Sequence, residues 1–235
     1  MKNIVIFGLG KIADVAYHYI VRDAQFNVVA FTVDSDWIVG ANAEATYHGR
    51  PVIPFESVQQ SYAPDSVSMF VAIGYHDLNT IRARKCAEAK AKGYDLVSYV
   101  SPRADTGGWL DIGENCLVLD GAGIQPGVCI GNNVSIWNNT LVGHHSEISD
   151  HCWLAAGATL GGGVKLGERS FVGLNATIGG EVSMGADCFL GADCLVIKSA
   201  PDRSVFVERG TERFRLDSKQ FLRLTTMPAM GATGV

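Results

Sequence analysis

The sequence predicts an α/β domain followed by a parallel β-helix, and two observations support this prediction. An aliphatic side chain recurs at every sixth residue from Ile112 to Val196, and such a fixed period outranks local signals. Before residue 101, apolar runs of strand length alternate with helix-forming segments, which is typical of a parallel sheet covered by helices. We therefore expect an α/β domain at residues 1–100, the β-helix at residues 101–200 and a C-terminal extension at residues 201–235.

The α/β domain is expected to begin with a strand from Asn3 to Phe7, followed by a glycine turn and a helix. Apolar residues of that helix share one face: Ile12, Val15, Ala16, Tyr19 and Ile20. Further strands are predicted from Phe26 to Val33 and from Val67 to Ile73. A strongly helix-forming segment then runs from Leu78 towards Gly93, a good C-cap residue. This alternation indicates a small parallel sheet.

The turn after the first strand has the form Gly-x-Gly-x-x-Ala, at residues 8–13. Gly8 and Gly10 let a phosphate approach the backbone, and the N-terminus of the following helix attracts its charge. Asp34, at the end of the second strand, is placed to accept hydrogen bonds from a ribose or sugar hydroxyl. The alternative is a tight turn without a ligand. A dehydrogenase is disfavoured, because the sheet is short and no second half-domain follows.

The six-residue period of the second part matches neither a helix nor a sustained strand alternation. It fits short strands joined by tight bends, with each aliphatic side chain pointing inward. Three hexads would close one triangular turn of eighteen residues, so the run would form five turns stacked at a spacing of roughly 4.8 Å. Glycine often follows the aliphatic residue directly, and we expect it to relieve an unusual φ at the bend.

Composition and charge limit the classes of function. Four of the six cysteines occupy the small inward position of the hexad, namely Cys116, Cys152, Cys188 and Cys194. No Cys-x-x-Cys occurs, so reduced thiols are expected rather than disulfides or metal ligands. The net charge of −5 argues against nucleic acid as the main partner. The N-terminus enters a strand rather than a signal peptide and no run of eighteen apolar residues occurs, so we expect no membrane insertion and a cytoplasmic location.

Three of the six histidines, His144, His145 and His151, lie close together in the repeat. Acyl transfer to an amine or hydroxyl needs a base of near-neutral pKa, which imidazole provides, and donors for the oxyanion. Residues 161–163, a glycine triplet about one turn further on, expose backbone amides. His145 and His151 are six residues apart and should point to different faces, so they cannot share an ion within one chain and we expect no metal.

The hexad, an aliphatic residue followed by glycine, two variable residues, a small residue and a variable one, resembles the repeat of hexapeptide-repeat acyltransferases. The resemblance implies that the β-helix is left-handed. The expected fold class is therefore an α/β N-terminal Rossmann-like domain followed by an all-β left-handed parallel β-helix. That combination resembles sugar-nucleotide N-acetyltransferases of bacterial glycan synthesis and the related sialic acid O-acetyltransferases.

By this resemblance, the N-terminal domain holds the nucleotide-linked sugar through Gly8, Gly10, Asp34, Ile73 and Gly74. The coenzyme's pantetheine is flanked by Gly161, Gly162, Gly173, Leu174, Asn175 and Gly191. From Lys198 to Arg223 there are seven Lys or Arg against four Asp or Glu, an excess that could meet the phosphates of coenzyme A or simply form a solvated face. A prism with three flat faces suits threefold packing, so we predict a homotrimer with active sites between subunits.

The segment from His144 to Ser149 resembles the family's catalytic histidine segment, so His144 is the preferred general base. The next position often carries an acid that orients the imidazole, but here it is His145. Several alternatives follow: Glu147 orients His144, a carboxylate from another subunit does so, or His145 is itself the base. His151 as the base and a purely structural role for the cluster are also open. The Gly162 N–H is expected to stabilise the oxyanion.

The predicted function is an acetyl-CoA-dependent acetyltransferase that N-acetylates the amine of a nucleotide-linked amino-deoxysugar, for bacterial surface glycan or lipopolysaccharide synthesis. The alternatives are an O-acetyltransferase acting on sialic acid or another surface sugar, a γ-carbonic-anhydrase-like metal hydratase, and a non-catalytic sugar-nucleotide-binding scaffold. The histidine spacing of the γ-class carbonic anhydrases does not occur here.

Overall fold

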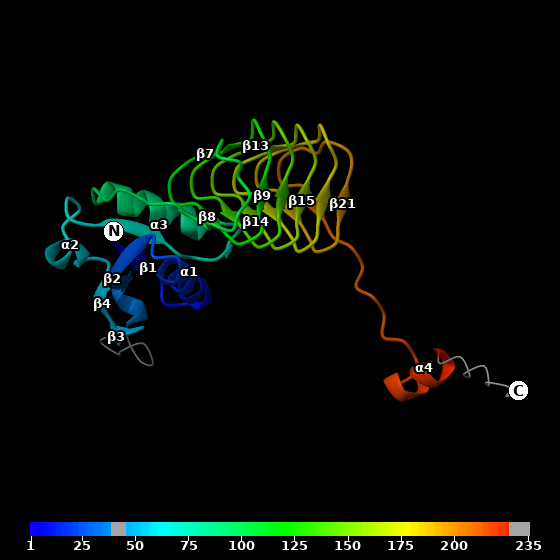
Figure 1. Cartoon of the computed structure of the whole chain (residues 1–235), viewed down its shortest axis with the longest axis horizontal. Helices are drawn as coiled ribbons and strands as arrows, with labels where there is room; N and C mark the ends of the chain where they lie inside the picture. The colour runs from blue at the N-terminus through cyan, green and yellow to red at the C-terminus, as the bar shows by residue number, and fades with distance from the viewer. Residues whose placement is uncertain (39–45, 226–235) are drawn as a thin grey trace, which may run out of the picture.

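The computed structural model describes residues 1–38 and 46–225, and it combines an α/β domain with a triangular prism of short strands (Figure 1). The α/β domain has one five-stranded sheet in the order β3-β4-β2-β1-β5. Its strands are β1 (Lys2–Phe7), β2 (Phe26–Val33), β3 (Thr46–Tyr47), β4 (Arg50–Pro54) and β5 (Ser68–Val71). Its helices are α1 (Lys11–Arg22), the 3-10 helix η1 (Ser35–Trp37), α2 (Val58–Ser61) and α3 (Thr80–Ala91). All neighbouring pairs in this sheet are parallel except β3 and β4.

The structure confirms the predicted strands and helices of this domain and adds one hairpin. The β3–β4 hairpin was not expected from the sequence, because its first strand is only two residues long. Helix α3 begins at Thr80 rather than Leu78, because Asp77, Leu78 and Asn79 have φ values of 50°, 44° and 65°. Three left-handed residues in a row cannot continue into a right-handed helix.

The prism has three faces, each formed by one parallel sheet. Face 1 contains β7 (Asp111–Ile112), β10 (Cys129–Ile130), β13 (Glu147–Ile148), β16 (Lys165–Leu166) and β19 (Ser183–Met184). Face 2 contains β6 (Tyr99–Val100), β8 (Leu117–Val118), β11 (Ser135–Ile136), β14 (Trp153–Leu154), β17 (Phe171–Val172), β20 (Phe189–Leu190) and β22 (Val205–Phe206). Face 3 contains β9 (Gly123–Ile124), β12 (Leu141–Val142), β15 (Thr159–Leu160), β18 (Thr177–Ile178) and β21 (Leu195–Val196). The chain visits the faces in the order 1, 2, 3, and paired strands are eighteen residues apart, as Cys129 and Glu147 are, except β20 and β22, where Phe189 pairs with Val205.

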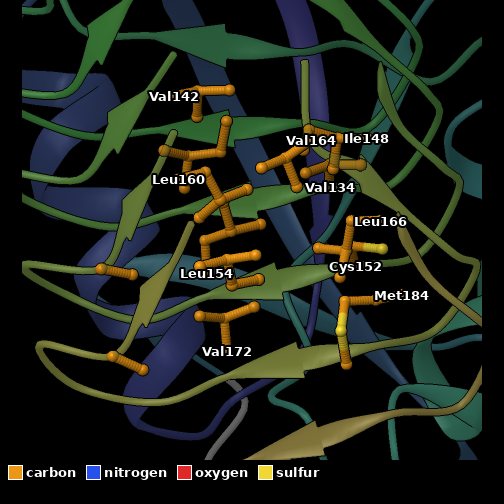
Figure 2. Packing of buried hydrophobic residues seen from close by; sticks show 14 of the residues in the cluster. Val134, Val142, Ile148, Cys152, Leu154, Leu160, Val164, Leu166, Val172 and Met184 are labelled. Atoms are coloured by element: carbon orange, nitrogen blue, oxygen red, sulfur yellow. The ribbon is translucent and has the colours of Figure 1, made fainter. Parts of the chain in front are cut away.

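The aliphatic residues of the hexads form one continuous core along the prism axis (Figure 2). Leu154, Leu160 and Val172 are fully buried in it. The four predicted cysteines are buried there as well, and the thiols of Cys116, Cys152 and Cys188 donate to backbone carbonyls as the serines at equivalent positions do. Cys152 Sγ donates to the Gly167 carbonyl at 3.2 Å, just as Ser170 Oγ donates to Gly185 at 3.2 Å. The six-residue period therefore predicted the strands, the core and the role of these cysteines correctly.

The expected role of the glycine that follows the aliphatic residue was wrong. Its φ is not positive, and it is required by close packing of adjacent turns instead. At Gly167, for example, a Cβ would lie 2.3 Å from the carbonyl carbon of Gly185. The left-handed φ falls two residues later, at the third residue after the aliphatic one, in every hexad except the last. Asn133 (φ 57°) and His145 (φ 57°) are examples.

The α/β domain packs on face 2 of the prism. Arg82 of α3 is buried in this interface, where its guanidinium donates to the carbonyls of Asn133, His151 and Cys152 and to Ser135 Oγ. At the other edge of face 2, helix α1 is held by ion pairs between Arg22 and Asp120. Strand β6 joins the two parts, because it already pairs with β8 of the prism.

Beyond the prism, the chain runs in an extended segment to helix α4 (Ser218–Thr225), which lies away from the prism (Figure 1). A short helix was predicted at this place. Residues 226–235 of the expected C-terminal extension lie outside the described residues. Within the described parts of the chain, none of the helices has the length and apolar character needed to cross a bilayer.

Candidate active site

His144 and His145 lie in the turn between β12 and β13, at the corner where face 3 meets face 1, and both are exposed. Their Nδ1 atoms are 3.1 Å apart, so one ring donates a hydrogen bond to the other. The His144 backbone N–H donates to Gln125 Oε1 at 2.9 Å, which holds the turn. A hydrogen bond between the two Nδ1 atoms uses neither Nε2 atom, so either Nε2 can exchange a proton with a bound reactant.

The glycine triplet lies one turn further along the same corner. The His144 ring rests against Gly162, where a Cβ would come within 2.5 Å of His144 Cε1. The backbone N–H of His144 donates to the side chain of Gln125, nineteen residues earlier in the chain. The residue nineteen positions before Gly162 is Gly143, which has no side chain to accept the Gly162 N–H. The Gly162 N–H consequently has no acceptor among the residues that the structure describes. It is available as a donor beside the imidazole.

The other predicted members of this site are placed elsewhere. The Glu147 carboxylate pairs with Lys165 Nζ at 3.2 Å, while the His144 ring is paired with His145. His151 lies at a different corner, between faces 1 and 2, where its Nδ1 is 2.8 Å from Asn133 Nδ2. Burial lowers the pKa of His151 below its usual value of 6.5. Of the predicted catalytic residues, His144, His145 and Gly162 come together within one chain.

A hollow of ≈ 550 Å³ lies on face 1 beside His145 and is also lined by Asp111, Cys129 and Glu147. Burial and the Asp111 carboxylate raise the pKa of the Cys129 thiol, which disfavours the thiolate and hence a nucleophilic role. A second hollow, of ≈ 600 Å³, lies at the amino-terminal ends of β1 and β5 and is lined by Met1, Lys2 and Asp95, far along the sheet from the glycine turn.

The five predicted substrate residues all lie at the carboxyl ends of neighbouring parallel strands. Gly8 follows β1, Asp34 follows β2, and Ile73 and Gly74 follow β5. Gly8 has φ 129°, and a Cβ there would lie 2.7 Å from the Ala72 carbonyl oxygen, so glycine is required. The strand order reverses between β1 and β5, which is where ligands bind in open α/β sheets.

Lys85 is a residue at this sheet edge that sequence reasoning missed. Its ammonium group lies 2.7 Å from Asp34 Oδ1 and 2.6 Å from Glu88 Oε2. Burial alone would lower the pKa of Lys85, but the hydrogen bonds to Asp34 and Glu88 outweigh it and raise the pKa. The Asp34 carboxylate therefore already has a cationic partner. The i,i+3 spacing of Lys85 and Glu88 could have indicated that these two residues pair. No sequence signal indicated that Lys85 also pairs with Asp34.

The predicted coenzyme residues fall into two groups on different corners. Gly161 and Gly162 lie beside His144 at the corner of faces 3 and 1. Gly173, Leu174, Asn175 and Gly191 follow β17 and β20, at the corner of faces 2 and 3. Leu174 is 55% exposed there. One chain does not bring the two groups into a single groove.

The two candidate sites also lie on opposite sides of the prism. The α/β domain covers face 2, whereas the histidine corner is the edge opposite that face. Trp137, on the side of the prism that the α/β domain covers, packs against Trp153, with ring centroids 5.3 Å apart, and against the core of the α/β domain. Its indole Nε1 is buried without a hydrogen-bond partner in the described structure.

A metal ion bound by the histidine corner would need a third ligand. In the described part of the chain, the one group of three or more His, Cys, Asp or Glu side chains with converging ligand atoms lies elsewhere, at Asp14, His18 and His48. The corner is therefore suited to proton transfer by imidazole and to hydrogen bonding by a backbone amide.

Comparison with protein families identifies the bacterial transferase hexapeptide, in its form of six repeats, at residues 111–144. This segment contains β7 to β12 and ends at His144. Comparison with curated protein sequences gives no match.

Solved structures resemble the chain over most of its length. A variant of perosamine N-acetyltransferase from Caulobacter crescentus, in complex with CoA and GDP-perosamine, superposes with a TM-score of 0.77 and 28% identity, covering 87% of this chain and 93% of that one. The acetyltransferase domain of PglB from Neisseria gonorrhoeae FA1090, in complex with acetyl coenzyme A, gives 0.76 and 22%, covering 87% and 95%. WeeI from Acinetobacter baumannii AYE gives 0.72 and 19%, covering 87% and 96%. The strands stack as in a left-handed β-helix, residues 111–144 match the bacterial transferase hexapeptide, and the chain is an acyltransferase that resembles a sugar N-acetyltransferase.

Proposed function

We propose that this enzyme uses acetyl-CoA to N-acetylate the amine of a nucleotide-linked amino-deoxysugar for bacterial surface glycan synthesis. The observation that supports this best is the 28% identical likeness, over 87% of the chain, to an enzyme solved with CoA and GDP-perosamine. The exposed imidazole pair beside an unpaired amide provides the base and the oxyanion donor that acyl transfer needs.

In the proposed mechanism, His144 Nδ1–H donates to His145 Nδ1, so His144 Nε2 carries the lone pair. His145 thus orients the His144 imidazole, a role that an acidic residue often has in the family that the sequence resembles. His144 Nε2 removes a proton from the amine as its nitrogen attacks the thioester carbonyl carbon. The Gly162 N–H donates to the oxyanion. The imidazolium then returns the proton to the departing thiolate, so the products are an amide and free coenzyme A.

We propose that the active form is a homotrimer whose sites lie between subunits. The support is that one chain is incomplete: its histidine corner and its α/β domain are on opposite sides of the prism. In a threefold assembly, the histidine corner of one subunit can face the corner of faces 2 and 3 of its neighbour, beside that neighbour's α/β domain. The same arrangement would join the two groups of coenzyme residues across one groove.

We propose that the α/β domain is Rossmann-like and binds the nucleotide-linked sugar. Gly8 and Gly10 would approach the phosphates, and Ile73 and Gly74 would line the other side of the crevice between β1 and β5. Asp34, held by Lys85, would accept a hydrogen bond from a sugar or ribose hydroxyl.

The basic segment from Lys198 to Arg223 is proposed to meet the coenzyme's phosphates. A cytoplasmic location fits the six free thiols, five of which are buried.

The test is release of free thiol from acetyl-CoA in the presence of UDP-, GDP- or dTDP-linked 4-amino or 3-amino sugars. Replacing His144→Ala should lower turnover by roughly 10² to 10⁴ without unfolding the protein. His151→Asn is the matched control and should retain turnover, because His151 lies at another corner. Turnover with hydroxyl acceptors alone would favour an O-acetyltransferase instead. A lack of thiol release with every acceptor would favour a binding scaffold, and near-normal turnover of His144→Ala would make His145 the base.

A further inference from the structure

A second cluster of histidines lies in the α/β domain, away from the acetyl-transfer site. Asp14 and His18 are one turn apart on α1, and His48 lies in the tight turn between β3 and β4. His48 Nε2 is 2.8 Å from Asp14 Oδ1, and His18 Nε2 is 3.4 Å from the same oxygen. One potential ligand atom from each residue lies within 4.8 Å of the others.

We propose that Asp14, His18 and His48 bind a divalent transition-metal ion, with zinc as the best match to this set of ligands. In a tetrahedral zinc site with bonds of about 2.0 to 2.2 Å, ligand atoms are separated by roughly 3.3 Å. The distances of 2.8 Å and 3.4 Å lie on either side of that value, and the third separation, between the two histidine ligand atoms, is at most 4.8 Å, so the three ligand atoms already converge. Three protein ligands leave the fourth position for water.

The type of ligand selects the metal. Two imidazoles and one carboxylate suit zinc, copper or nickel, whereas magnesium and calcium prefer sites made only of oxygen. The Asp14–His48 hydrogen bond alone explains two of the residues but gives no reason for His18, whose side chain is 66% exposed, to face the same oxygen.

His48 is held in place before any ion binds. Its φ is +49°, a left-handed conformation that is costly for a residue with a Cβ, and the following Gly49 has φ +69°. The Tyr17 ring stacks on the imidazole with centroids 4.3 Å apart and planes 13° apart. Positive φ values at both residues are those of a two-residue hairpin turn, and this turn places the ring of His48 beside Asp14.

An ion at this place would connect the β3–β4 hairpin to α1. Without an ion, the contacts between the hairpin and α1 include the Asp14–His48 hydrogen bond and the stacking of the Tyr17 and His48 rings, whose centroids are 4.3 Å apart. The ion would therefore stabilise the folded α/β domain by binding only to the native arrangement of helix and hairpin. It takes no part in acyl transfer.

The experiment uses tag-free full-length protein that has been treated with a chelator and carries Cys129→Ser to remove the exposed thiol. Isothermal titration with ZnCl₂ should show one saturable site per chain, and ZnCl₂ should raise the melting temperature. His18→Ala, Asp14→Asn and His48→Asn should each weaken zinc binding by at least about tenfold. His48→Asn keeps a residue that tolerates the left-handed turn, and His18→Ala changes an exposed position, so both should fold.

The matched control is His76→Ala, which removes an exposed histidine of the same domain and should leave zinc binding unchanged. The proposal is overturned if no saturable site appears, if all three cluster variants bind zinc like the parent, or if MgCl₂ binds as tightly as ZnCl₂. Binding is measured without substrate, so this result does not depend on whether the enzyme acetylates an amino sugar.

Discussion

At the residue scale, two separate constraints shape each corner of the prism. Glycine after the aliphatic residue permits the next turn to approach, and the residue two places later carries the left-handed φ. Asn and Asp suit that second place because their short polar side chains tolerate it, but His145, Arg169 and Glu181 occupy it too. Residues with a proposed catalytic role or an ion pair thus occupy positions where the left-handed backbone conformation costs free energy.

Replacing Gly167→Ala should destabilise the protein by roughly 1–3 kcal/mol or more, because the new Cβ would lie 2.3 Å from backbone atoms that cannot rotate away. Gly210→Ala is the control, since a Cβ at Gly210 has nothing within 4 Å. Urea unfolding of both variants measures the difference. Equal stability of the two would show that the turns are not packed as described.

The stability of the protein should fall as pH drops below about 6.5, in part through His151. Burial lowers its pKa in the folded state, so the unfolded chain takes up a proton first and stability is lost as pH falls through this range. Protonation of Nδ1 would also break the contact with Asn133. His151→Asn should remove this part of the slope in a series of urea titrations from pH 8 to pH 5. An unchanged slope would contradict the assignment.

The catalytic pair shows what the sequence could not predict at this scale. Spacing and resemblance pointed to His144 and His145, but whether Glu147 could reach them depends on side-chain direction. Glu147 lies in a strand and faces outward to Lys165, whereas the histidines lie in the preceding corner. The φ of 57° at His145 follows the repeat, but the repeat does not specify that the two adjacent rings turn toward each other and form a hydrogen bond.

At the scale of elements, helix α3 is fixed to the prism by one buried guanidinium. Burial lowers the pKa of Arg82 to about 10, so it remains charged at neutral pH, and backbone carbonyls surround it in place of a carboxylate. Its Nε has no hydrogen-bond partner in the described structure. The arrangement needs a planar fork of donors, which only arginine supplies.

Arg82→Lys should therefore destabilise the protein by roughly 2–4 kcal/mol, because one ammonium group cannot reach both Asn133 and Cys152 and leaves buried carbonyls unpaired. The control is Arg84→Lys, an exposed position on the same helix that pairs with Glu88. It should change stability by less than about 0.5 kcal/mol. Thermal and urea unfolding measure both variants, and a neutral Arg82→Lys would rule out this role.

Elements with a regular sequence period were predicted best, and elements without one were missed. The repeat of six residues marked the face-forming strands from β7 to β21 but not β6 and β22 at the two ends of face 2, and β2 matches its predicted bounds, Phe26–Val33. The β3–β4 hairpin was missed because its two-residue strand carries no period, and its turn, His48-Gly49, is not one of the usual hairpin pairs. The start of α3 was missed because the left-handed run at residues 77–79 is maintained by tertiary contacts, including Asn79 with Arg169.

At the scale of the whole molecule, the separation of the two candidate sites gives the proposed trimer a direct test. Gly10 lies in open space, so Gly10→Phe should fold normally while blocking the crevice at the sheet edge. This variant and His144→Ala should each be inactive alone. Co-expressed in equal amounts, they should form mixed trimers in which about a quarter of the sites combine an intact His144 with an intact crevice.

Thiol release by the purified mixed trimers measures this complementation, and light scattering measures their mass. If mixed trimers of Gly10→Phe and His144→Ala subunits form but stay inactive, each site lies within one subunit. A monomeric enzyme with full activity would lead to the same conclusion.

The coil of eighteen residues also has an evolutionary consequence. Each coil contacts mainly the coil before and the coil after it, so gain or loss of eighteen residues downstream of Glu181 would preserve every strand register and shift the C-terminus by roughly 4.8 Å. An insertion of six residues would instead move every later residue to the wrong face. Changes in the length of this protein are therefore expected in whole coils, which lets the prism grow or shrink without redesigning the histidine corner or the face that holds the α/β domain.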